Sequence, residues 1–180
     1  MNRKRKAKIS NKFKRPAVFL DRDGTINYDR GYTYKFSEFK FRPFVIKGLK
    51  YLTEKKYFIF VITNQAGIAK GKYKISDLLL LNKKLKKFLK NKSITINEIQ
   101  YCPYHPNATI KRYKKKTDLR KPGNLMIRKI LKKWNIDLKK SFMIGDKKTD
   151  SQAAKKSNLY FEFVRNNFYK QVKRITNSYL

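Results

Sequence analysis

The feature that most constrains the fold is a short apolar run followed at once by two acidic residues. Residues 18–20 are valine, phenylalanine and leucine, and Asp21 and Asp23 follow with one residue between them. Such a run predicts a short buried strand, and Gly24 predicts the turn that ends it. Two carboxylates this close repel each other unless a cation lies between them, and divalent cations prefer carboxylate oxygens. Taken alone, the pattern fits a metal and phosphoryl site and an exposed Asx turn equally well.

The composition indicates one domain with a hydrophobic core. Of the 180 residues, 41% are hydrophobic and 14% are aromatic, which suffices for a single core. No apolar run approaches the roughly 20 residues that a membrane helix needs, and no apolar segment typical of a signal peptide follows the charged N-terminus. The single cysteine, Cys102, excludes an internal disulfide and favours the reducing cytoplasm. We also expect a monomer.

Charge is the unusual property of the chain. Lysine and arginine total 47 against 12 aspartates and glutamates, a net charge of +35. Such an excess is typical of nucleic-acid-binding proteins, but here lysine is spread through nearly every segment, which favours a general compositional bias. We therefore expect nucleic acid to bind non-specifically at most. Residues 1–15 are rich in lysine and arginine and contain one aromatic residue, Phe13, so they predict a flexible basic tail before one domain at residues 16–180.

Strand and helix signals alternate along the rest of the chain. Apolar, β-branched and aromatic runs predict strands at residues 17–20, 57–62, 98–102, 141–144 and 159–164. Helical spacing predicts helices from Pro43 to about Lys56, from a cap at Ser76 to about Lys90, over residues 126–134, and near Asp150. For the second helix we expect an apolar side made of Leu79, Leu80, Leu85, Phe88 and Leu89. This alternation predicts an α/β fold with a doubly wound parallel sheet.

Polar residues follow the predicted strands where each strand ends. In chain order they are Asp21 and Asp23, Thr63 and Asn64, Arg120 and Lys121, and Asp146 and Asp150. The carboxyl ends of parallel strands meet at one edge of the sheet, where ligands bind in open α/β folds. Any one of these residues could be an ordinary solvated side chain or a helix cap. Their recurrence at successive strand ends predicts one shared site.

This array resembles the haloacid dehalogenase superfamily of phosphotransferases, whose four motifs occur here in the same order over residues 16–164. The segments FLDRDGTIN, GY, VITNQAGIAKGKY, YCPYHP, RKP and MIGDKKTD are most similar to the D-glycero-D-manno-heptose 1,7-bisphosphate phosphatase group. Histidinol-phosphate phosphatases and polynucleotide 3′-phosphatases are relatives of that group. The resemblance implies a Rossmann-like core without a large cap domain.

The resemblance also implies catalytic roles. Asp21 would attack phosphorus and form an aspartyl-phosphate, and Asp23, protonated at the start, would donate to the leaving oxygen and later deprotonate water. Mg²⁺ would be held by Asp21, the backbone carbonyl of Asp23, and Asp146. Thr63 and Lys121 would cover the phosphoryl oxygens. Asp150 would orient Lys121 or metal-bound water.

Substrate-binding positions follow from the same resemblance. A small phosphorylated sugar would contact a loop after the first strand, the residues after Thr63, a guanidinium suited to a second phosphate, and a lysine after the metal ligand. These residues are Asp29, Arg30, Gly31, Tyr32, Asn64, Gln65, Ala66, Arg120 and Lys147. Arg30 stands where the family has a histidine.

A departure from the family concerns zinc. Relatives carry a Cys-x-His pair after the third strand and a Cys-x-Cys pair before Arg-Lys-Pro, whereas this chain has Cys102, a displaced His105, and Thr117-Asp118-Leu119. Four ligands define a structural zinc site, so we predict that zinc is absent. The loop at residues 107–119 must then be held in another way or remain mobile.

Three interpretations remain open. The favoured one is a Mg²⁺-dependent phosphatase of the heptose bisphosphate type, which makes sugar precursors of the bacterial envelope lipopolysaccharide. The second is a phosphatase for histidinol phosphate or another small metabolite. The third is a nucleic-acid 3′-phosphatase or a nucleic-acid-binding protein that uses the basic tail, although a binding protein has no need for all four acids.

Overall fold

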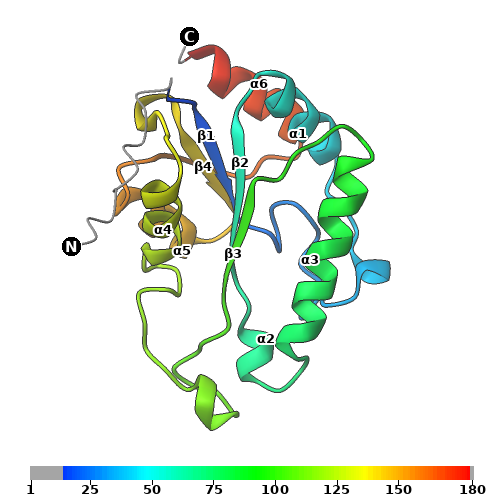
Figure 1. Cartoon of the computed structure of the whole chain (residues 1–180), viewed down its shortest axis with the longest axis vertical. Helices are drawn as coiled ribbons and strands as arrows, with labels where there is room; N and C mark the ends of the chain where they lie inside the picture. The colour runs from blue at the N-terminus through cyan, green and yellow to red at the C-terminus, as the bar shows by residue number, and fades with distance from the viewer. Residues whose placement is uncertain (1–13, 179–180) are drawn as a thin grey trace, which may run out of the picture.

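Five parallel strands form a single sheet in the computed structural model, which describes residues 14–178 (Figure 1). The strands are β1 (Ala17–Leu20), β2 (Phe58–Asn64), β3 (Glu98–Cys102), β4 (Phe142–Gly145) and β5 (Tyr160–Phe163). They lie in the order β3-β2-β1-β4-β5, so the first strand in the chain is central and pairs on both sides. All four β1 residues are fully buried as a result. The predicted doubly wound α/β sheet is confirmed.

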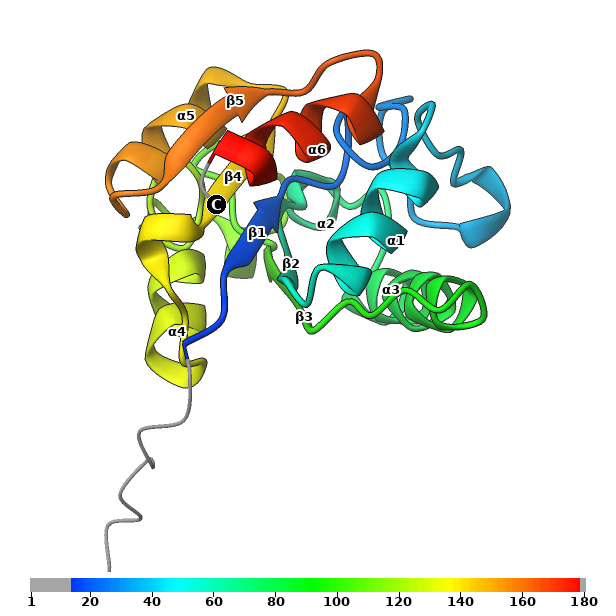
Figure 2. The ribbon, with the colours of Figure 1, turned by 90° about the horizontal axis from the view of Figure 1, so that it is seen from above.

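Helices cover both faces of this sheet, as Figure 2 shows from above. They are α1 (Val45–Glu54), α2 (Ala66–Ala69), α3 (Ile75–Lys90), α4 (Leu125–Lys133), α5 (Lys148–Lys155) and α6 (Phe168–Ser178). Strand residues alternate between the faces, so Val18 and Leu20 pack with α1, α3 and α6, whereas Phe19 packs with α4 and α5. The two hydrophobic cores therefore lie on opposite sides of β1.

The predicted apolar side of α3 is partly wrong. Leu79 and Leu80 are 49% and 52% exposed, and the buried leucines are Leu78, Leu81, Leu85 and Leu89. Four consecutive leucines cannot all face the core, because successive helical residues point about 100° apart. The four buried leucines follow one another at spacings of three or four residues, which places them on one face of the helix. The helix also begins at Ile75, and Lys74 rather than Ser76 is its N-cap.

Helix α6 was not predicted from the sequence. It returns after β5 and packs against α1, with Phe168 against Gly48. A Cβ atom on residue 48 would lie 2.5 Å from the Phe168 ring, so the absence of a side chain there permits this close packing. The folded domain therefore extends well past residue 164.

Arg15 belongs to the folded domain and not to the expected tail. Its backbone exchanges hydrogen bonds with Asn135 and Asp137, and its side chain donates to the Lys56 carbonyl and lies over the Phe58 ring. Residues 1–13, to which the tail prediction otherwise applies, lie outside the described residues.

At the carboxyl edge of the sheet, the segments that follow β2 and β3 extend to the lower end of Figure 1, where they form α2 and the short 3₁₀ turn Lys111–Tyr113. Within residues 14–178, no large cap domain covers this edge of the sheet. No helix among the described residues is long and apolar enough to cross a membrane.

The packing of α6 predicts a large effect of Phe168→Ala on stability. Because Phe168 is 1% exposed, we expect the substitution to lower the free energy of unfolding by about 3–5 kcal/mol, measured by denaturant titration. The control Leu80→Ala removes a leucine that is 52% exposed and should change it by less than about 0.5 kcal/mol. Equal effects of the two substitutions would contradict the packing of α6 described above.

Candidate active site

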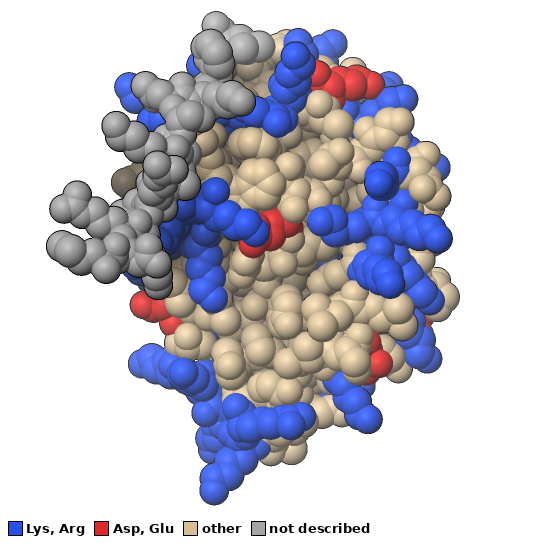
Figure 3. Space-filling view, viewed as in Figure 1, with Lys and Arg blue, Asp and Glu red and all other residues tan. Residues whose placement is uncertain are grey.

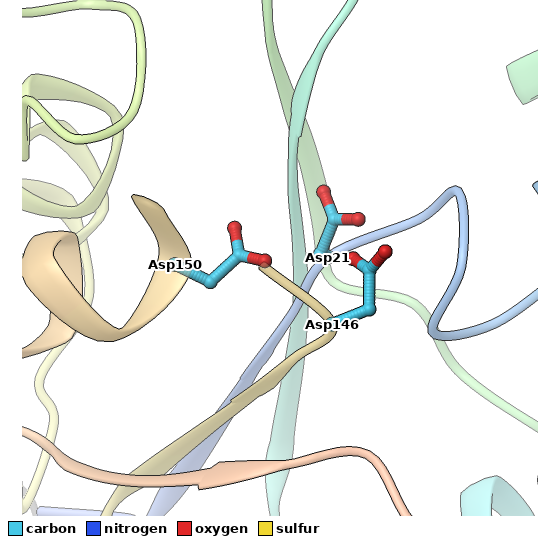
Figure 4. Close-up of side chains that lie close together, drawn as sticks. All are labelled: Asp21, Asp146 and Asp150. Atoms are coloured by element: carbon cyan, nitrogen blue, oxygen red, sulfur yellow. The ribbon is translucent and has the colours of Figure 1, made fainter. Parts of the chain in front are cut away.

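Three carboxylates meet at the carboxyl end of the sheet (Figure 4). Asp21 follows β1, Asp146 follows β4, and Asp150 lies in the first turn of α5. Each residue offers one oxygen, and these oxygens lie within 4.8 Å of one another. Because β1 and β4 are neighbours in the sheet, their parallel pairing brings the two strand ends together.

Two glycines allow the carboxylates to come so close. Gly24 has φ of 93°, which disfavours residues with a side chain, and an added Cβ would collide with the Asp146 carboxylate. A Cβ on Gly145 would meet the side chain of Asp150. Any larger residue at either position would therefore displace an acid of the site.

The ammonium group of Lys121 lies among these acids. Its Nζ is 2.5 Å from Asp21 Oδ1, 2.6 Å from Asp150 Oδ1 and 2.8 Å from the Ile62 carbonyl oxygen, to which it donates. The residue is 3% exposed. Asn64 positions its backbone, because the Asn64 amide donates to the Lys121 carbonyl and accepts from the Lys121 N–H, both at 3.0 Å.

The pKa values reflect this crowding of charges. Burial raises the pKa of Asp21 to about 7, against the opposing effect of the Lys121 charge, and Asp150 and Asp23 raise it further. Burial also raises the pKa of Asp146. For Lys121, burial alone would lower the pKa, but the neighbouring Asp21 and Asp150 carboxylates raise it above its usual value. The site thus holds more negative charge than Lys121 alone balances.

The donor set fits a divalent metal ion. Asp146 Oδ1 is buried and receives no hydrogen bond from the described residues, whereas both Asp150 oxygens are engaged, one by Lys121 and the other by the Lys147 N–H. Asp21 and Asp146 are therefore the side chains available to a hard cation, and such ions prefer oxygen ligands.

Asp23 lies where two hollows adjoin. A small one of about 40 Å³ is lined by Asp21, Thr63 and Lys121, and a larger cleft of about 400 Å³ opens beside it. Asp23, Asn64, Lys147 and Thr149 line both. The Asp23 carboxylate accepts hydrogen bonds from neighbouring side chains, namely Arg22, Asn27 and Gln65.

The larger cleft contains most of the predicted substrate-binding residues. Its lining includes Asp29, Gly31, Tyr32, Asn64, Gln65, Ala66, Arg120 and Lys147. Arg30 is exposed and is not among the residues that line it. Lys147 Nζ lies 3.1 Å from Asp29 Oδ2, so these two side chains pair across the rim. Gln65 is 2% exposed, with its amide bonded to protein groups.

The sequence matches the family described as polynucleotide kinase 3 phosphatase over residues 17–173. The chain belongs to this family. It is also 43% identical over 139 residues to the D-glycero-beta-D-manno-heptose-1,7-bisphosphate 7-phosphatase of Photorhabdus laumondii, covering 77% of this chain and 74% of that protein. With the Escherichia coli K12 protein of the same name it shares 37% identity over 144 residues, covering 80% and 75%. The recognition of a phosphatase family from the sequence is confirmed.

Solved structures agree with this assignment. A HAD-like phosphatase from Mesorhizobium loti superposes with a TM-score of 0.81 at 26% identity, covering 91% of this phosphatase and 87% of that chain. The D,D-heptose 1,7-bisphosphate phosphatase of B. bronchiseptica, solved with magnesium and phosphate, has a TM-score of 0.73 at 24% identity, covering 88% of this chain and 86% of that chain. At 24% identity, the similarity to this second structure supports the fold alone.

Sequence reasoning missed several residues of this phosphatase that contact the predicted ones. They are Arg22, Asn27, Tyr73 and Thr149. Arg22 and Asn27 lie within the first motif. Of the two, only Arg22 could have been predicted from the sequence, because a positive charge between two acids is expected to form an ion pair, and it is wholly buried. Tyr73 ends the segment VITNQAGIAKGKY, but nothing in that motif indicates its contact with Gln65, which forms only in the fold.

The loop after β3 is held by protein contacts. His105 and Lys115 pair with this loop's own backbone, and the Ile110 N–H donates to the carbonyl of Ala69 at 3.0 Å. Tyr113 packs onto a cluster that includes Ile68. Burial raises the pKa of the Cys102 thiol, which opposes formation of the thiolate that binds metal. The absence of zinc stays a prediction.

The carboxylate geometry predicts that Mg²⁺ stabilises the folded protein. Adding Mg²⁺ to metal-free protein should raise the melting temperature, by an amount equivalent to about 2.7 kcal/mol at a hundredfold excess over Kd. Asp146→Asn should remove most of this shift. Glu38→Gln removes the same charge at an exposed side chain and should retain it. An unchanged shift in Asp146→Asn would contradict the assignment.

The protein-held loop predicts that the purified protein contains no stoichiometric zinc, which elemental analysis measures directly. Four ligands are needed for a closed structural site, and the loop offers one thiol and one imidazole. A stoichiometric zinc that disappears in Cys102→Ser would show that the prediction is wrong.

Proposed function

We propose that this phosphatase removes the 7-phosphate of D-glycero-D-manno-heptose 1,7-bisphosphate or a close sugar bisphosphate. The observation that supports this most is the pair of adjoining hollows, one around Asp21 and Lys121 and one lined by Arg120 and Lys147. The first suits the phosphoryl group that reacts, and the second suits a sugar with a second phosphate. The substrate named for the Photorhabdus relative has this form.

In the proposed reaction, an oxygen of Asp21 attacks phosphorus while the bond from phosphorus to the sugar oxygen breaks, which gives an aspartyl-phosphate. Water then attacks this intermediate, releasing phosphate and restoring the carboxylate. The Lys121 ammonium group, 2.5 Å from Asp21 Oδ1, holds the nucleophile in place and offsets negative charge on the phosphoryl oxygens. The Thr63 hydroxyl lines the same hollow and donates to another of those oxygens.

Asp23 is proposed as the proton donor and acceptor. It lines both hollows, so its carboxyl group lies between the reacting phosphoryl group and the sugar. An alkoxide is a poor leaving group, and a proton from Asp23 removes that difficulty. In the second step Asp23 takes the proton from the attacking water, which returns the site to its starting state.

A bound Mg²⁺ would neutralise charge between the nucleophile and the phosphate dianion. The proposed ligands are Asp21 and Asp146, with the Asp23 backbone carbonyl implied by the family resemblance. Asp150 holds Lys121 instead, because its Oδ1 lies 2.6 Å from Lys121 Nζ.

A second phosphate would bind at the far side of the cleft. Arg120 is half-buried, its guanidinium donates to the Tyr104 carbonyl at 3.4 Å, and it lines both the substrate cleft and a neighbouring basic cavity of about 580 Å³. Lys147 pairs with Asp29 and can exchange that partner for a phosphate. A guanidinium presents two parallel donors, which matches a phosphate dianion.

A nucleic-acid 3′-phosphatase is the second candidate, because the matched family is named for one and the net charge is +35. Against it, lysine and arginine are scattered over several elements of the face in Figure 3 and do not form one stripe. We propose that nucleic acid binds non-specifically, with an affinity that falls steeply with salt. We also propose that the protein is a cytoplasmic monomer with one catalytic domain after its basic N-terminal segment.

A phosphate-release assay over matched substrates tests the proposal. We expect turnover of the heptose bisphosphate to exceed that of histidinol phosphate and of a 3′-phosphorylated oligonucleotide, and Asp21→Asn to lower kcat at least about 1,000-fold because no other carboxylate can replace the nucleophile. Efficient release from the oligonucleotide with the sugar left untouched would overturn the substrate assignment. Full activity of Asp21→Asn would overturn the mechanism.

A further inference from the structure

Gln65 follows β2 at the edge of the active site, and its amide makes four hydrogen bonds to protein groups. Its Nε2 donates to Asp23 Oδ2 and to Thr63 Oγ1, each at 2.8 Å. Its Oε1 accepts from the Tyr73 hydroxyl at 2.5 Å and from Arg22 Nη2 at 3.1 Å. An amide has two hydrogens and one carbonyl oxygen, so these contacts use both donors and both acceptor positions. Nothing of the amide is left for a substrate.

The orientation of this amide is determined by its neighbours. A guanidinium only donates, so the Gln65 oxygen must face Arg22 and the nitrogen must face Asp23. Tyr73 acts in the same sense, because burial raises the pKa of its hydroxyl above the usual value and keeps it protonated. Arg22 also donates to Asp23 Oδ2 and to the Thr33 carbonyl, which holds the guanidinium in place.

We propose that Gln65, held by Tyr73 and Arg22, is a positioning residue that fixes the Asp23 carboxyl group between the phosphoryl hollow and the substrate cleft. The inference rests on the proposed function, in which Asp23 passes a proton to the leaving group. It differs from the substrate-contacting role that the family resemblance implies for Gln65. It also assigns a purpose to Tyr73, whose hydroxyl donates to Gln65 Oε1.

The geometry explains why such a residue is needed. Asp23 comes directly before the turn at Gly24 and lines both hollows, so the orientation of its carboxyl group depends on the side chains that donate to it. Proton transfer requires the donor within hydrogen-bonding reach of the leaving oxygen, and small displacements there are costly. Gln65 and Arg22 donate to Asp23 Oδ2 and Asn27 donates to Oδ1, and these hydrogen bonds restrict rotation of the carboxyl group.

The test compares leaving groups. Gln65→Met keeps the side-chain length and removes the amide, and we expect kcat for the best alkyl phosphate of the substrate panel to fall about 10- to 100-fold with KM nearly unchanged. With 4-nitrophenyl phosphate, whose leaving group needs little protonation, the fall should be at least about fivefold smaller. In an Asp23→Asn background this difference between substrates should vanish, because Gln65 acts through Asp23.

Tyr73→Phe provides a milder change, since the ring and its stacking on Tyr34 at 5.3 Å remain while the hydroxyl is lost. We again expect a larger loss of kcat on the alkyl phosphate than on 4-nitrophenyl phosphate, with smaller fold-changes than for Gln65→Met. The matched control Tyr34→Phe alters the stacked partner and should leave both substrates unaffected. Melting temperatures verify that each variant folds.

Two results would overturn the inference. One is equal losses on alkyl and aryl phosphates, and the other is a raised KM at unchanged kcat, which would make Gln65 a substrate ligand. Failure of the proposed function gives a different result, because Asp21→Asn would then retain turnover of both substrates.

Discussion

The buried ammonium group of Lys121 is the interaction on which the active site depends. It contacts Asp21 after β1, Asp150 in α5 and the carbonyl of Ile62 in β2, so one cation joins three elements that approach the site from different directions. Removing one partner from a buried ion cluster commonly costs about 3–5 kcal/mol, because the remaining charges are left without compensation. Lys121 makes no ion pair with Asp146, whose buried Oδ1 has no hydrogen-bond partner among the described residues, so this oxygen fits a second cation.

Two hydrogen-bond networks meet at the end of β2, one around Lys121 and one around Asp23. Asn64 bonds to the backbone of Lys121 in both directions and so orients the residue whose ammonium group lies beside Asp21. The next residue, Gln65, donates to Asp23, the proposed proton donor. Adjacent residues at one strand end therefore bond to the residues that we propose for the two ends of the breaking bond. Four residues of β2 pair with the central strand β1, which ties this strand end to Asp21.

The sheet and the gathering of acids at its carboxyl edge could be predicted because they depend on local patterns. Apolar runs gave all five strands, and the acids directly after them lie at the strand ends. Prediction was wrong where the pattern was locally ambiguous, as in the leucine run of α3, whose buried side depends on which residues face β2 and α1. It missed α6, although Phe168, Val172 and Ile175 recur at helical spacing, because so few apolar residues stand among the polar ones of this segment.

Strand periodicity and motif spacing are properties of neighbouring residues, so the α/β class, the phosphatase family and the acids at the strand ends could be read from the chain. The strand order, the pairing of Lys121 with Asp150, and the hydrogen bond from Tyr73 to Gln65 are evident only in the folded structure. The folded structure also shows that the loop after β3 is held by backbone hydrogen bonds and by Tyr113. Hydrogen bonds and ion pairs between distant segments require suitable angles, and distances that are correct to within a few tenths of an ångström. This geometry arises only when the sheet and its helices have packed.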